Sequence, residues 1–246
     1  MLGLIGKKLG QTRVHDADGN VVSVTVVQAG PNHVLQVKTP ARDGYSAVQL
    51  GFDAQKEQRL SKPLAGHLKK NGGAIVKRLR EFRDFAVDVK PGDVVGPALF
   101  EIGDFVDAIG ITKGRGFQGV VKRHGFGGGP SSHGSKGWHR RPGAIGCRTW
   151  PGWIRPGMTM PGHMGQVRRT VQNLEIMRVD ETDQLLLIKG AIPGAPGDYV
   201  IIRESKKVPK PLAQKRRAER EAERQAALEA QAKAKEKGKG KARGRK

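Results

Sequence analysis

The sequence predicts a mainly β protein, in which a small closed barrel carries a long irregular inserted loop and a basic C-terminal tail. Short stretches rich in Val, Ile and Thr recur along the chain between Gly, Pro and Asp turns, a spacing typical of a small barrel. Residues 108–174 contain 11 Lys or Arg but no Asp or Glu. From residue 206 onward the chain is again rich in Lys and Arg.

The strands are predicted from β-branched runs that are bounded by turn signals. Val21–Val27 follows an Asp-Gly-Asn turn, and Tyr45–Phe52 follows Arg-Asp-Gly. Alternation and turn spacing predict further strands at His33–Lys38, Val87–Val95 (interrupted by a tight turn at 90–93), Phe105–Thr112, Leu174–Val179, Leu185–Lys189 and Tyr199–Arg203. Helices are expected over Lys62–Lys70 and Ile75–Arg80.

The distribution of charge divides the chain into a body and two cationic arms. Net charge is +3 over 1–107, +11 over 108–174, −3 over 175–205 and +11 over 206–246. We therefore expect 1–112 and 170–205 to form one β-barrel body, 113–169 to be an inserted extension, and 206–246 to be a basic tail. Helically spaced Lys and Glu predict a solvated helix in the tail, followed by a disordered end from Gly238.

The inserted extension needs a partner of opposite charge. Like charges repel and oppose compaction, and so long a loop without its own structure is unusual inside a compact domain. Glycines let the backbone approach a ligand closely, basic side chains contact phosphates, and Trp rings stack on bases. The partner that fits is nucleic acid. The candidate RNA-binding residues are Lys7, Lys8, Lys113, Arg115, Lys122, Arg123, His124, His133, Lys136, Trp138, His139, Arg140, Arg141, Cys147, Arg148, Trp150, Trp153, Arg155, His163, Arg168 and Arg169.

Other functions fit the sequence less well. The loop Gly114–Gly119 matches nucleotide-binding strings, but the next acidic residue that could hold a ribose is Glu175. Cys147 and the nearby histidines do not have the spacing of zinc ligands, and no acidic residue surrounds Cys147 to support nucleophilic catalysis. We therefore expect no enzymatic activity, no metal and no cofactor. A core role for the Trp residues and a merely solvated role for the tail remain the plain alternatives.

Composition also bears on the compartment. A single cysteine allows no internal disulfide, which fits a reducing cytosol. No signal peptide is visible, and the longest aliphatic run, Leu185–Ile188, is too short to cross a bilayer. The basic arm also lacks the apolar stripe of membrane-surface helices. We expect a cytoplasmic protein without a membrane partner.

The stretch Phe100–Arg123 resembles the signature of the universal large-subunit ribosomal protein three family. Further family features recur in order at 5–10, 29–32, 44–49, 66–70, 125–126, 132–135, 141–146, 160–165 and 190–194. The resemblance covers 1–205 and implies a translation-protein-type β-barrel on the ribosome surface. It also implies binding to rRNA near the 3′ end of the large-subunit RNA early in assembly, neighbouring ribosomal proteins as partners, no small-molecule substrate, and a loop directed toward the peptidyl transferase centre.

Two departures from the family pattern lie at Gln11, where Met is usual, and at Cys147, where many bacterial members carry a methylatable Gln. That methylation cannot occur on Cys147. The sequence leaves two alternative functions. A nucleotide-dependent enzyme would bind ATP or a dinucleotide at the glycine loop. A nucleic-acid chaperone or translational regulator would act off the ribosome and would not sediment with large subunits.

Overall fold

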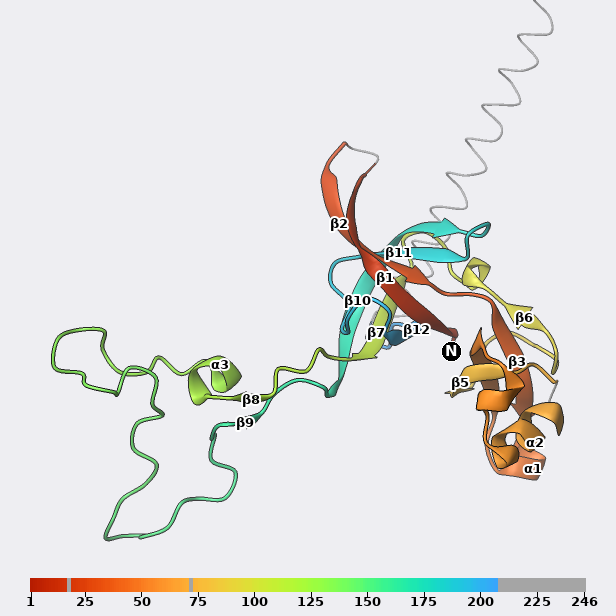
Figure 1. Cartoon of the computed structure of the whole chain (residues 1–246). Coiled ribbons are helices and arrows are strands. Elements are labelled where there is room, and N and C mark those ends of the chain that lie inside the picture. Colours follow the sequence, from red (N-terminus) through yellow and green to blue (C-terminus); the bar gives the residue numbers. More distant parts are fainter. Residues whose placement is uncertain (17–18, 71–72, 208–246) are drawn as a thin grey trace, which may run out of the picture.

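The computed structural model describes residues 1–16, 19–70 and 73–207, so the helix and disordered end expected in the tail lie outside the described residues. Six antiparallel strands close into a barrel in the order β1, β12, β7, β10, β11, β2 (Figure 1). Their bounds are β1 Gly3–His15, β2 Val21–Gln28, β7 Phe105–Ile111, β10 Arg168–Asp180, β11 Leu185–Lys189 and β12 Tyr199–Glu204. The prediction of a mainly β fold with a closed barrel is confirmed.

A second sheet lies beside the barrel (Figure 1). Its strand order is β5, β4, β3, β6, and its strands span β3 Asn32–Lys38, β4 Ala47–Ala54, β5 Val76–Arg83 and β6 Val94–Val95. The connections contain the short helix α1 (Pro40–Asp43), helix α2 (Lys62–Lys70) and two 3-10 turns, η1 (Glu57–Arg59) and η2 (Pro97–Leu99).

Helix α2 has the bounds that the sequence predicted, but three other expectations differ. Residues 75–80 are not helical, because β5 pairs along its length with β4, with Arg80 opposite Leu50. The run 87–95 is reduced to the two-residue strand β6. Strand β1 went unpredicted, because the Gly and Lys residues in it interrupt the apolar alternation.

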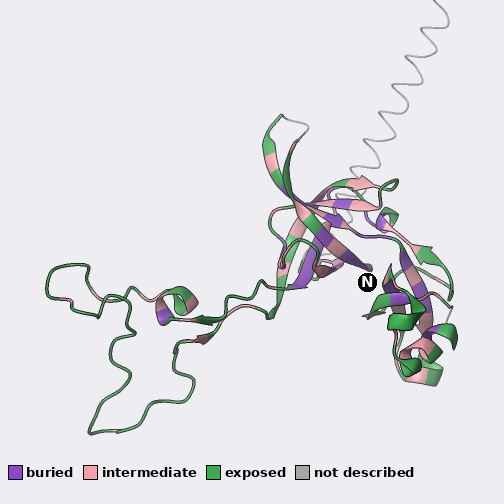
Figure 2. Ribbon diagram, in the orientation of Figure 1, coloured by how far each residue is buried: buried purple, intermediate pink, exposed green. Residues whose placement is uncertain are grey.

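One apolar core joins the barrel to the second sheet. Leu4, Ile176 and Ile202 inside the barrel belong to the same cluster of buried side chains as Val34 and Phe82 of the second sheet. Each fully buried Leu, Ile or Phe contributes about 1.5–3 kcal/mol to folding. A smaller cluster on the opposite face of the second sheet packs beneath α2. The buried positions in Figure 2 follow both layers.

The contact between β1 and β5 depends on a glycine. A Cβ atom added at Gly3 would lie 2.3 Å from Cδ1 of Phe82. Only a residue without a side chain lets the aromatic ring pack directly against the backbone of the first barrel strand.

Asn32 supplies the buried polar link between the two sheets. Its side chain is fully buried at the start of β3. Its Oδ1 accepts a hydrogen bond from the N–H of Ile5 (3.2 Å), and its Nδ2 donates to the carbonyl of Ile5 (3.1 Å) and to that of Ala29 (2.8 Å). The amide thus pairs with a β1 residue much as a backbone would.

Replacing Asn32 with Ala is expected to lower the free energy of unfolding by about 1–3 kcal/mol, because buried backbone groups of Ile5 and Ala29 lose their partner. The matched control is His33→Ala on the same strand, whose half-buried side chain contributes none of these bonds. Urea unfolding of both variants measures the difference. Equal stabilities would show that Asn32 is not the link.

Candidate nucleic-acid interface

The extension leaves the barrel and returns to it at two neighbouring strands. Strands β7 and β10 are antiparallel partners, with Ile111 opposite Arg168 where the extension joins them. Beyond that pair, the N–H of Thr112 donates to the carbonyl of Val167 (3.0 Å), and the N–H of Gln166 donates to the carbonyl of Thr112 (3.1 Å). The two limbs therefore start side by side as a continuation of the barrel wall.

The limbs stay paired farther out. The N–H of Arg115 donates to the carbonyl of Met164 (2.9 Å), and the N–H of Met164 donates to the carbonyl of Gly116 (2.9 Å). Next, β8 (Phe117–Gln118) pairs with β9 (Gly162–His163), which Figure 1 shows projecting away from the barrel. We refer to residues 112–118 and 162–167 as the stem.

Gly165 is required for the stem by both its conformation and its surroundings. Its φ of +80° is one that L side chains rarely adopt. A Cβ atom at this position would also lie 2.2 Å from the carbonyl oxygen of Lys113 on the opposite limb. A larger residue would separate the two limbs.

Helix α3 (Val120–His124) braces the end of the stem. Val120 is buried beneath it. The guanidinium of Arg123 donates to the carbonyl of Met160 (2.5 Å), and Nε2 of His124 lies 3.1 Å from the same oxygen. A Cβ atom on Gly162 would lie 2.7 Å from Nη1 of Arg123. Arg123 therefore ties the two limbs together rather than pointing wholly outward.

A second crossing closes part of the outer loop. The N–H of Gly129 donates to the carbonyl of His139 (3.1 Å), and Nδ1 of His139 lies 2.9 Å from the carbonyl of Pro130. The guanidinium of Arg141 lies over the ring of Trp138, 4.9 Å from its centre. These contacts order one lobe without building a core.

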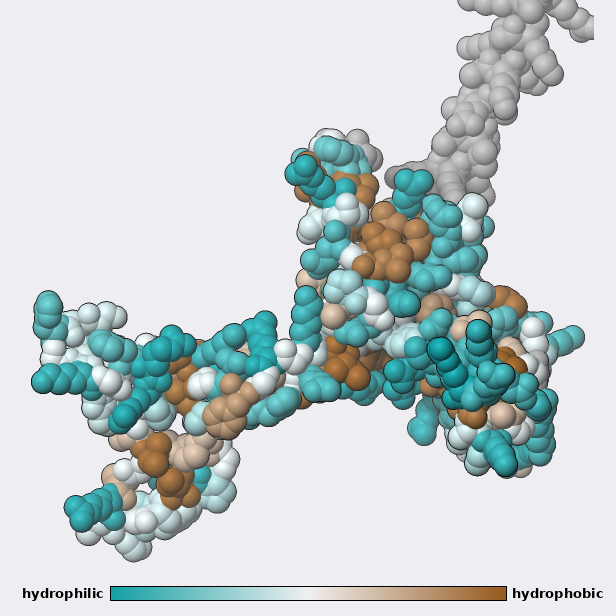
Figure 3. Space-filling view, viewed as in Figure 1, coloured by the Kyte–Doolittle hydropathy of each residue, from teal (hydrophilic) through white to brown (hydrophobic). Residues whose placement is uncertain are grey.

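The outer surface of the extension combines exposed rings with uncompensated positive charge. Trp150 is 85% exposed and Phe117 is 76% exposed. Figures 2 and 3 show a thin, largely exposed segment where apolar groups lie among hydrophilic ones. In the described ranges 1–16, 19–70 and 73–207, every ion pair lies in the body and none includes a residue of 113–169. Exposed cations and aromatic rings are the groups with which nucleic-acid-binding proteins contact the backbone and the bases.

Most of the predicted RNA-binding residues are exposed on this surface. They are Lys113, Arg115, Lys122, His124, His133, Lys136, Trp138, His139, Arg140, Arg141, Cys147, Arg148, Trp150, Trp153, Arg155, His163, Arg168 and Arg169. Lys7 and Arg123 are half-buried. The structure brings Trp138 together with Arg141, and Arg123 with His124, while Trp150 extends into solvent.

Lys8 lies elsewhere. It is 6% exposed, and its ammonium donates to the carbonyls of Ile192 (2.7 Å) and Gly194 (3.0 Å). Burial and, after it, the positive charge of Lys113 lower the pKa of Lys8, against an opposing effect of Asp198. Lys8 fastens the loop before β12 to β1, and we leave it out of the interface.

Comparison with known proteins agrees with this geometry. The family model for ribosomal protein L3 matches residues 54–185, more than half of the chain. The chain is 48% identical over 209 residues to large ribosomal subunit protein uL3 of Burkholderia multivorans, covering 84% of this chain and 97% of that protein. It is 46% identical to uL3 of Ralstonia pickettii, with coverages of 84% and 96%.

The chain belongs to the ribosomal protein L3 family. Membership makes it a structural constituent of the large ribosomal subunit, in a family that is not enzymatic. The resemblance found in the signature motifs is thereby confirmed.

The glycine loop at 114–119 has a structural use in this L3 chain. The N–H of Arg115 and the carbonyl of Gly116 are taken up by Met164 on the opposite limb. A nucleotide-binding loop needs such amides free to cradle phosphates. Within the part of the chain that the structure describes, no three His, Cys, Asp or Glu residues gather as a metal site would require, and no helix is long and apolar enough to span a membrane.

Sequence reasoning missed the residues that close the stem, among them Thr112, Met160 and Gly165. They carry no charge and act through backbone groups and, at Thr112, also through a hydroxyl that donates to the carbonyl of Val167 (3.2 Å), so composition alone does not distinguish them. The available signal was the pair of Gly-rich segments at 114–119 and 162–165, which flank the outer loop at similar distances from the strands.

Trp150→Ala is expected to change the stability of the isolated protein by less than about 0.5 kcal/mol, because the ring is exposed and packs in no core. Ile202→Ala in the barrel should cost about 2–5 kcal/mol and provides the comparison. Thermal unfolding reports both values. A strongly destabilised Trp150 variant would make this ring a core residue.

Proposed function

We propose that this L3 protein binds large-subunit rRNA near its 3′ end early in assembly and directs its extension through folded RNA toward the peptidyl transferase centre. The proposal is supported above all by the charge of the extension, which contains no Asp or Glu of its own. Family membership supports the ribosomal setting, since the relatives are large-subunit proteins. The protein then works in the cytoplasm, on the ribosome, beside other large-subunit proteins.

Binding would release counterions from RNA. Each Lys or Arg that neutralises a phosphate frees condensed cations, and many such contacts along an extended segment give tight, salt-sensitive association. Lys113, Arg115 and Lys122 lie on or beside the stem and would contact the RNA backbone near the barrel. Arg148 and Arg155 would do so in the outer loop.

The exposed rings would contribute stacking. A base that stacks on an aromatic side chain gains about 1–3 kcal/mol. Trp138 carries Arg141 on one face, and Trp150 and Trp153 stand in the outer loop around a glycine turn at 152. The paired stem would keep these rings at a fixed distance from the barrel, because its limbs are hydrogen-bonded from Thr112 to Gln118.

Sedimentation through sucrose separates this function from action off the ribosome. The protein should co-migrate with large subunits in lysate and remain there in moderate salt. A protein found mainly at the top of the gradient would contradict the proposal and favour a free chaperone or regulator.

The salt dependence of RNA binding should report the contacts at the stem. Replacing Lys113, Arg115 and Lys122 with Ala is expected to flatten the plot of log affinity against log salt by roughly 2–3 units if each neutralises one phosphate. The control replaces Lys56, Arg59 and Lys62 on the far side of the second sheet, which removes the same charge. Equal slopes for the two variants would place the stem cations away from RNA.

Changes at Trp150 or Arg148 should leave incorporation into subunits intact while altering sensitivity to drugs that bind the peptidyl transferase centre. One lost stacking ring, at about 1–3 kcal/mol, cannot detach a protein held by many phosphate contacts, but it lets nearby RNA shift. Growth inhibition by such drugs, with Trp150→Phe as the conservative control, provides the measurement. Unchanged sensitivity and unchanged peptide transfer would show that the extension does not reach the centre.

A further inference from the structure

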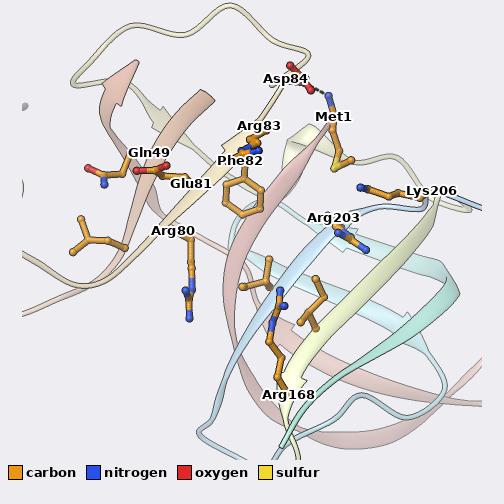
Figure 4. Close-up of a pocket in the computed structure, with 13 residues that line it drawn as sticks. Met1, Gln49, Arg80, Glu81, Phe82, Arg83, Asp84, Arg168, Arg203 and Lys206 are labelled. Carbon is orange, nitrogen blue, oxygen red and sulfur yellow. Dashed lines mark hydrogen bonds between the residues drawn. The ribbon is translucent and has the colours of Figure 1, made fainter. Parts of the chain in front are cut away.

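A cleft opens between the barrel and the second sheet, and Arg168 is the one residue of the extension that lines it. Its volume is about 670 Å³. Strand β5 forms one wall, and the outer faces of β12, β7 and β10 form the other (Figure 4). The volume lies within the range of cavities that hold ligands.

The strand registers explain which side chains meet there. On β5, Arg80 and Phe82 share one face, and Phe82 packs against Gly3 of the barrel, so Arg80 also faces the barrel. On β12, Val200 and Ile202 point into the barrel core, and the residues that alternate with them, Ile201 and Arg203, point outward. The floor of the cleft is therefore apolar, and basic side chains stand around it.

The cleft carries excess positive charge. Five basic side chains and two carboxylates line it: Arg80, Arg83, Arg168, Arg203 and Lys206, with Glu81 and Asp84. Glu81 is already held by Lys38 at 2.7 Å and by the hydroxyl of Tyr45 at 3.0 Å. In the described part of the chain, the side chains of Arg80, Arg168 and Lys206 form no ion pair.

Arg203 has unused hydrogen-bonding capacity. One of its terminal nitrogens lies 3.3 Å from Oδ2 of the fully buried Asp107, which fixes the guanidinium against the barrel wall. Its Nε is buried and has no hydrogen-bond partner within the described residues. A buried donor without a partner is unfavourable, so an acceptor that reaches this nitrogen would stabilise the guanidinium.

Arg168 connects the cleft with the extension. It is the first residue of β10, opposite Ile111 at the base of the stem, and it also lines the cleft. An anionic strand that follows the stem toward the barrel would therefore meet Arg168 at the edge of the cleft.

We propose that the cleft binds a single-stranded segment of RNA, with phosphates at Arg80, Arg168, Arg203 and Lys206 and a base or ribose against the partly exposed Ile201. Repeated phosphates suit cations spread over two walls, and an apolar floor suits the planar faces of bases. This inference deepens the proposed function by adding a second RNA contact between the barrel and the second sheet.

The test compares full-length variants on a transcript of the 3′ portion of a bacterial large-subunit rRNA. Arg80→Ala with Lys206→Ala removes one cation from each wall and is expected to flatten the salt slope by roughly 1.4 units, at about 0.7 per phosphate of a single strand. Hydroxyl-radical footprinting should show that this variant loses one protected RNA segment and keeps the segment protected by the extension. Arg59→Ala with Lys62→Ala removes the same charge elsewhere and should keep both segments.

The outcomes are distinguishable. If the cleft variant matches its control in slope and footprint while the stem variant weakens binding, this inference is overturned and the proposed function stands. If neither variant weakens binding, both this inference and the proposed function fail.

A competition experiment tests the assignment to RNA. If an oligoglutamate peptide of equal charge displaces no RNA, the assignment to RNA is supported. If it binds the wild type tightly and the cleft variant poorly, the cleft serves an acidic protein instead, and the inference is overturned.

Discussion

Electrostatic repulsion within residues 108–174 constrains the rest of the structure. Eleven cationic side chains in this segment have no acidic neighbour in sequence, and the ion pairs of the described chain all lie in the body. Such a segment cannot collapse on itself, because compaction brings like charges together. Between the two barrel strands it extends instead, with most of its cations and its Trp rings exposed.

The barrel holds both ends of the segment in place, because the extension begins and ends at the paired strands β7 and β10. Strand β7 is hydrogen-bonded to β10 on one side and to β12 on the other, and the first half of β10, which receives the end of the extension, is paired with β7. The stem continues their pairing outward, and Gly165 permits the close approach of its limbs. Because its ends are fixed and its stem is hydrogen-bonded, the extension projects from the barrel in a defined direction although its like charges repel.

Buried polar side chains hold the parts of the body together. Asn32 joins the second sheet to β1 through both atoms of its amide, and Lys8 holds the loop at 192–194 through two carbonyls. Both act as internal ties. Lys8 shows that a Lys predicted from sequence to bind RNA can instead be buried, with its ammonium bonded to backbone carbonyls.

Much of this architecture could be predicted from the sequence. Strands such as β2 and helix α2 carry strong local signals, and the charge pattern locates the extension. The errors have physical causes: β5 is basic and helix-compatible, and pairing with β4 determines its conformation. The cleft could not be predicted at all, since closure of the barrel brings together residues as distant as Arg80, Arg168 and Arg203.

Amide hydrogen exchange tests the central claim most directly, with the protein measured alone and bound to large-subunit rRNA. Amides of 119–161 outside α3 are exposed and make few hydrogen bonds, so the account predicts rapid exchange in the free protein and strong slowing in the complex, while the barrel strands are slow in both. Slow exchange throughout 119–161 without RNA, or rapid exchange that persists in the complex, would contradict the claim that this segment exists to be held by RNA.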